Sequence, residues 1–154
     1  MIIGNKETFA IELTINENNP KMGYGKLWLQ NSFLGTSEDL IFLNGYLISL
    51  IDEIINSKEI NFELENINEI KIFEVLKSNS KKRSDFAIIG STFTDDFEIY
   101  SYKKNDKIIV LWKLIHDKEM IFNELKKYSK EIQFASVLLI ELEIVKKKIL
   151  EIIN

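Results

Sequence analysis

The chain has 154 residues and a formal net charge of −4, with 45% hydrophobic and 29% charged side chains. This composition is typical of a globular domain and excludes an intrinsically disordered chain. The absence of cysteine excludes disulfides, thiolate metal sites and cysteine nucleophiles, and the mild acidity argues against sequence-independent binding to nucleic acid.

The first part of the chain predicts antiparallel strands. Residues 8–15 alternate apolar and polar side chains with the period of a strand that has one buried face. Residues 25–30 supply a second strand, and Asn31-Ser32 can form its tight turn into a short third strand, Phe33-Leu34. These segments predict three consecutive strands.

Two helices are expected next. Ser37 can cap a helix over about 38–56, whose apolar residues recur at helical spacing. Asn44-Gly45 lies inside this segment, and an interior glycine costs a helix about 1 kcal/mol relative to alanine. A second helix is expected over about 67–77, where apolar side chains again recur at helical spacing.

The second half is dominated by segments that resemble strands, at 85–89, 97–102, 107–115 and 131–137. Residues 103–106 suit a hairpin connection. Residues 78–84 are polar and basic and are expected to form a loop, whereas 116–130 fit either a helix or a loop. A C-terminal helix is expected to start at Ser136 or Val137 and to bury an apolar stripe.

This order of elements lacks the regular strand–helix alternation of a parallel sheet. It predicts an α+β fold, with a mainly antiparallel sheet of about six strands and two to four helices packed on it. Because there is no internal repeat and no linker rich in proline, glycine or serine, residues 1–154 are expected to form a single domain.

The sequence contains no recognisable catalytic or metal-binding motif. The single histidine, His116, precedes Asp117, and this pair can orient an imidazole as a base or contribute one metal ligand; a surface-loop histidine is the simpler interpretation. Gly23-Tyr24-Gly25 lacks the third glycine and the following helix of a phosphate-binding loop, so it predicts a turn. We therefore expect no catalytic residues, no metal site and no cofactor.

Two groups of acidic residues are candidate partner-binding residues. Asp95, Asp96 and Glu98 lie at the start of an expected strand, and Glu63 and Glu65 belong to an acidic stretch with few lysines. Each group fits a solvated surface, a negative patch for a basic protein, or a weak metal or acid–base site.

The two tryptophans lie in expected strands. Trp112 alternates with apolar residues and is expected to face the core or a packed edge. Trp28 shares its face with Lys26 and Gln30, which makes it the better candidate for a partly exposed binding anchor, although a core position is the default expectation.

Neither nucleic acid nor a membrane is expected as a partner. Lys81-Lys82-Arg83 lies in a loop without interleaved aromatic residues, and Lys146-Lys147-Lys148 lies on the polar face of the expected last helix, so both fit solvated lysines. No apolar run approaches the roughly 18 residues of a membrane span. The N-terminal residues lack the pattern of a secretory signal, so a cytoplasmic location is expected.

Short stretches in both halves of the chain carry a resemblance. In the first half they are Met1–Asn5 with Phe9–Glu12, then Tyr24–Asn31 and Phe33–Gly35. In the second half they are Ile108–Leu114 around Trp112, then Tyr128, Ile132–Val137 and the closing helix. Together they resemble bacterial immunity proteins of polymorphic toxin systems, and most closely the immunity protein 42 family.

This resemblance implies a non-enzymatic inhibitor, made beside a toxin so that the producing cell survives. Such a protein is expected to bind the C-terminal domain of its cognate toxin and to occlude the active site, and the resemblance transfers no catalytic residue. Two alternatives are a small metal-assisted hydrolase that uses His116 and Asp117, and a structural protein-interaction module with no toxin.

Overall fold

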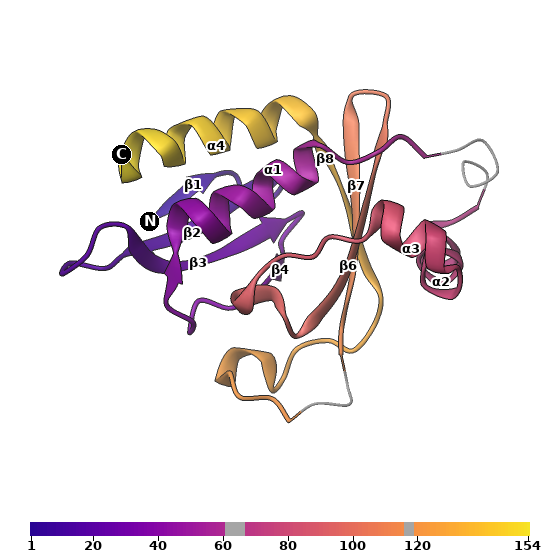
Figure 1. Ribbon diagram of the computed structural model, residues 1–154, viewed down its shortest axis with the longest axis horizontal. Helices are drawn as coiled ribbons and strands as arrows, with labels where there is room; N and C mark the ends of the chain where they lie inside the picture. Colours follow the sequence, from indigo (N-terminus) through magenta and orange to yellow (C-terminus); the bar gives the residue numbers. More distant parts are fainter. Residues whose placement is uncertain (61–66, 116–118) are drawn as a thin grey trace.

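The strands are divided between two antiparallel sheets in the computed structural model, which describes residues 1–60, 67–115 and 119–154 (Figure 1). The first sheet contains β1 (Ile2–Gly4), β2 (Phe9–Ile15), β3 (Met22–Leu29), β4 (Ser32–Leu34) and β5 (Ile41–Phe42). Its order is β1-β2-β3-β4, and β5 pairs with the opposite end of β3 from β4. The second sheet has the order β6 (Phe97–Lys104), β7 (Lys107–Leu114) and β8 (Gln133–Leu138).

The helices cover one face of each sheet (Figure 1). A π-helix, η1 (Leu43–Ile48), runs directly into α1 (Ser49–Ile55), and this pair packs beside α4 (Leu139–Ile153) on the first sheet. The pair α2 (Glu69–Ser78) and α3 (Ser80–Phe86) packs on the second sheet. Two short 3₁₀ turns, η2 (Thr92–Thr94) and η3 (Asn123–Leu125), lie in the connections.

Two apolar cores follow from the alternation of side chains along the second sheet. On β6, Ile99 faces the larger core, which it shares with the first sheet, α1 and α4, whereas Tyr100 faces the smaller core under α2 and α3. Trp112 is fully buried in the larger core, as predicted. The second sheet therefore separates the two cores and has apolar side chains packed on both of its faces.

The prediction of an α+β fold with antiparallel strands is confirmed. The described residues form two sheets with eight strands in total, where a sheet of about six strands was expected. The additional strands are short: β1 has three residues and β5 has two, too few for alternation to be recognised in the sequence.

The prediction for residues 78–89 is wrong. Residues 78–84 were expected to form a loop and 85–89 a strand, but α3 occupies Ser80–Phe86. The Asn79 side chain accepts a hydrogen bond from the Lys82 backbone N–H (3.1 Å), which caps this helix immediately after α2 ends. Ala87 then makes only an isolated bridge with Tyr100.

The helix expected from residue 38 starts later, at Leu43. Ile41 and Phe42 pair with β3 before it, because the backbone is still extended there. Between residues 116 and 130, the described part contains only η3 and turns. No helix among the described residues is both long enough and apolar enough to span a membrane.

Candidate functional site

Asp95 and Asp96 lie on the connection between η2 and β6, where Asp95 is exposed and Asp96 is half-buried. The turn that presents them is held by reciprocal bonds between Ser91 and Thr94: the Ser91 N–H donates to Thr94 Oγ1 (3.1 Å), which donates to the Ser91 carbonyl (3.0 Å). At the other end, the Ile115 N–H donates to the Asp96 carbonyl (2.8 Å). The two carboxylates are thus presented on a well-braced turn.

A second acidic loop lies beside this turn (Figure 1). The Thr36 N–H donates to the Phe93 carbonyl (3.0 Å), which joins the connection between β4 and β5 to η2. Glu38 and Asp39 follow Thr36 on the same connection; Glu38 is exposed and Asp39 is half-buried. We call the set Glu38, Asp39, Asp95 and Asp96 the acidic rim.

Glu98 is placed elsewhere. Its carboxylate accepts a hydrogen bond from the Tyr100 hydroxyl (2.6 Å) and lies 3.4 Å from the Lys77 ammonium, on the side of the second sheet that α2 and α3 cover. Burial, together with the hydrogen bond to Glu98, raises the pKa of Tyr100 far above its ordinary value, so the phenol stays a donor. Glu98 therefore belongs to a local polar cluster, apart from the acidic rim.

Trp28 is half-buried on the face of the first sheet opposite the helices. Its indole N–H donates to Glu12 Oε2 (2.8 Å), and the Lys6 ammonium lies 3.9 Å from the ring centroid. The Trp28 ring packs on Phe33, whose ring centroid lies 4.9 Å from that of Tyr128. The Tyr128 ring in turn lies 5.2 Å from the ring of Phe97 on β6. The rings of Phe33 and Tyr128 therefore lie between Trp28 and Phe97, the residue that follows Asp96.

Four residues considered from the sequence, Glu63, Glu65, His116 and Asp117, lie outside the described residues. Within residues 1–60, 67–115 and 119–154, no group of three or more histidine, aspartate or glutamate side chains has the geometry of a metal site.

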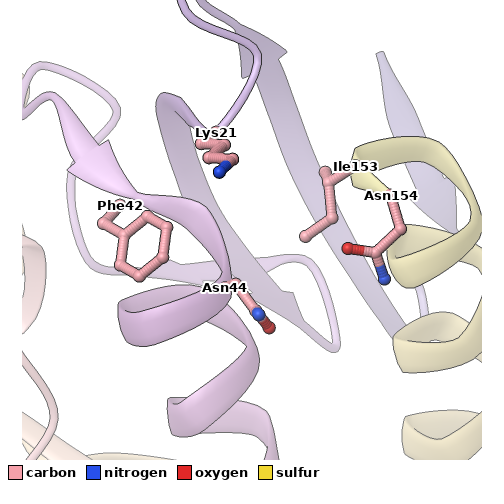
Figure 2. A pocket seen from close by; sticks show the side chains of 5 residues that line it. All are labelled: Lys21, Phe42, Asn44, Ile153 and Asn154. Carbon is pink, nitrogen blue, oxygen red and sulfur yellow. The ribbon is translucent and has the colours of Figure 1, made fainter.

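A pocket of about 240 Å³ opens between η1 and the end of α4 (Figure 2). It is lined by Lys21, Phe42, Asn44, Ile153 and Asn154. These side chains offer an ammonium, two amides and apolar surface, but no nucleophile paired with a base. This pocket can make contacts with a partner, and its side chains do not form a catalytic group.

Three exposed apolar residues beside this pocket were not singled out from the sequence. Leu40, Phe42 and Tyr46 are 42%, 41% and 41% exposed, respectively. Leu40 lies in the segment 38–56 that was expected to form a helix, but it precedes β5 and points outward while Ile41 is buried. The signal in the sequence was the Asn44-Gly45 pair, which marks an irregular helix next to two aromatic residues.

The comparisons with known proteins identify a family for this chain and a solved structure with a similar fold. The crystal structure of CdiI from Burkholderia dolosa AUO158 has a similar fold, with a TM-score of 0.63 at 14% sequence identity, and the alignment covers 98% of this chain and 99% of that chain. No curated protein matches this sequence. The sequence model of the family described as immunity protein 42 matches residues 1–154. The resemblance seen in the short stretches is thereby confirmed, and the chain belongs to the immunity protein 42 family.

Proposed function

We propose that this immunity protein neutralises its cognate toxin by binding the toxin's C-terminal domain directly and covering its active site, without catalysing a reaction itself. The observation that carries this proposal is the family match over residues 1–154. The similarity to CdiI supports a role in contact-dependent inhibition. In this proposal the whole chain acts as one immunity domain in the cytoplasm of the protected cell.

The acidic rim is the part of the surface that we assign to the toxin. Four carboxylates from two neighbouring loops, on a chain with a net charge of −4, suit a toxin domain with a basic active-site surface. Such a surface speeds the encounter between partners and fixes their orientation. A stable complex of this kind buries about 800 Å² on each partner, so the rim is one part of a wider contact.

The remaining candidates lie outside the rim. Glu98 contacts Lys77 and Tyr100, and Trp28 contacts Lys6 and Glu12. We propose them as contacts of a surface that extends beyond the rim. Glu63 and Glu65 are proposed as further contacts on the basis of charge alone.

The function is tested by co-expressing the chain with the toxin domain encoded beside it. We expect the two proteins to co-purify and the cells to survive. The double variant Asp95→Lys/Asp96→Lys reverses charge on the rim, and we expect it to bind the toxin at least about tenfold more weakly. The control, Glu131→Lys/Glu143→Lys, makes the same charge change at exposed positions on other elements and should bind within about twofold of wild type.

The outcomes separate two ideas. If the wild-type chain neither binds nor protects against that toxin domain, the proposed function is wrong. If the wild-type chain protects but Asp95→Lys/Asp96→Lys protects equally well at matched expression, the function stands and the assignment of the acidic rim is wrong.

A further inference from the structure

The exposed ring of Phe42 packs against backbone. A Cβ atom on Gly45 would lie 2.5 Å from Phe42 Cδ1 and 2.9 Å from Cε1, so the ring rests directly on the backbone of η1. The backbone around it is also fixed, because Phe42 pairs with Met22 and the Leu43 N–H donates to the Lys21 carbonyl (3.0 Å). Figure 2 shows the ring above the first turn of η1. A large apolar side chain is thus supported by backbone on one side and 41% exposed.

Leu40 and Tyr46 extend this apolar surface. Leu40 and Phe42 lie on the same side of the extended chain, with buried Ile41 between them pointing to the core. Tyr46 lies four residues after Phe42, on η1 itself. We call Leu40, Phe42 and Tyr46 the Phe42 cluster. Its helix is of the π type, a rare conformation that occurs frequently at functional sites.

Acidic residues precede the Phe42 cluster in the chain. Glu38 and Asp39 of the acidic rim come directly before Leu40. Lys21 lines the pocket beside Phe42 and is a basic side chain at the edge of this surface. The cluster therefore continues directly from the acidic rim.

The other exposed apolar stripe has a different character. Ile140, Ile144 and Ile152 are 55%, 46% and 42% exposed along α4, but Lys147 and Lys148 interrupt them. This stripe carries no aromatic side chain. Aromatic residues are enriched at the centres of protein interfaces, where lysine is depleted. The Phe42 cluster has the composition of an interface centre, and the α4 stripe does not.

We propose that the Phe42 cluster is the apolar centre of the surface that binds the toxin domain, with the acidic rim at its margin. The occupant is a toxin domain that presents an apolar patch bordered by basic side chains, because the cluster is apolar and continues directly from the acidic rim. This inference rests on the proposed function. It adds that desolvation of the Phe42 ring stabilises the bound complex, while the acidic rim mainly accelerates its formation.

The test uses the full chain and the purified toxin domain, with affinity measured by calorimetry or surface plasmon resonance. We expect Phe42→Ala to weaken binding about 30-fold or more, as for a central anchor, and Tyr46→Ala about tenfold. Phe134→Ala is the matched control, because Phe134 is a similarly exposed phenylalanine (48%) on β8. It should bind within about twofold of wild type.

Thermal unfolding of each variant shows whether weaker binding comes from a lost contact with the toxin or from an unfolded protein. Tyr46→Ala, at a position that is also 41% exposed, is the second variant in case Phe42→Ala does not fold. If wild type binds the toxin and both folded variants bind equally tightly, this inference is wrong and the proposed function stands. If the free wild-type chain is a dimer that Phe42→Ala converts to a monomer, the cluster is a self-association surface and the inference is also wrong.

Discussion

Glu124 joins the connection after β7 to the first sheet. Its carboxylate accepts hydrogen bonds from Lys26 Nζ (2.8 Å), from Thr36 Oγ1 (2.6 Å) and from the Ser37 N–H. Burial acts to raise the pKa of Glu124, but these bonds outweigh it and hold the pKa below its ordinary value of 4.5. Lys26 is only 8% exposed, so this carboxylate also neutralises a buried ammonium.

We predict that Glu124→Gln lowers the free energy of unfolding at pH 7 by about 2 kcal/mol, the scale of a charged hydrogen bond. Because the folded pKa is depressed, the stabilisation from Glu124 is present above pH 4.5 and is lost as the pH falls through the lower folded value. The difference from wild type should therefore shrink in urea unfolding at pH 3. A difference that stays the same at both pH values would contradict the charged role of Glu124.

Tyr128 provides a second link between the sheets. Its hydroxyl accepts from Trp112 Nε1 (2.8 Å) and donates to the Phe33 carbonyl. Burial raises the pKa of Tyr128 to about 12, so the hydroxyl keeps its proton over the physiological range and can donate. In this way the indole N–H of a fully buried tryptophan is satisfied, as buried polar groups must be.

At the scale of elements, η1 supports two exposed aromatic residues, Phe42 directly before it and Tyr46 on it. The hydrogen bonds of a π-helix run from residue i to residue i+5, and in this first turn Gly45 lies directly under the Phe42 ring. A side chain at position 45 would occupy the place of the ring. Glycine is therefore required for contact at this position, despite its cost to a helix.

We predict that Gly45→Ala displaces the Phe42 ring and weakens toxin binding about three- to tenfold, because the anchor is no longer preorganised. The melting temperature should change by only a few degrees, since the better helix propensity of alanine offsets part of the lost contact. Affinity measurement and thermal unfolding on the same sample test both statements. Unchanged affinity together with a shifted Phe42 ring in a crystal structure would contradict the requirement for a fixed ring.

At the scale of the whole molecule, charge and apolar surface have separate consequences. The chain carries a net charge of −4, and carboxylates from two loops gather at the acidic rim. Interactions between exposed charges act over about 8–10 Å at physiological salt. They therefore govern how quickly a basic partner approaches, whereas apolar contacts govern how long it stays.

We predict that the association rate with the toxin domain falls about tenfold or more between 0.05 and 0.5 M NaCl, while the dissociation rate changes little. Stopped-flow or surface plasmon resonance at several salt concentrations measures both rates. The variant Asp95→Lys/Asp96→Lys should show a weaker salt dependence. An association rate that does not respond to salt would contradict electrostatic steering by the rim.

The strands and helices with clear local patterns could be predicted from the sequence. Period-2 alternation located β2, β6 and β7 to within two residues at most of their ends, and helical spacing located α2 and α4. Helix α3 was missed because its basic residues show no apolar periodicity. It begins directly after α2, where the Asn79 side chain caps it. The sequence left Trp28 between a core position and a partly exposed one, and the structure makes it half-buried.

The sequence by itself determined the class of fold, the main strands and the relationship to immunity proteins, because alternation, helical spacing and short family stretches are local properties. Only the tertiary structure decided that the strands form two sheets, that Glu98 joins Lys77 and Tyr100, and that Leu40 points outward. The acidic rim likewise depends on a bond between Thr36 and Phe93, which are far apart in the chain. Such contacts form only when distant segments pack together, and no local pattern encodes them.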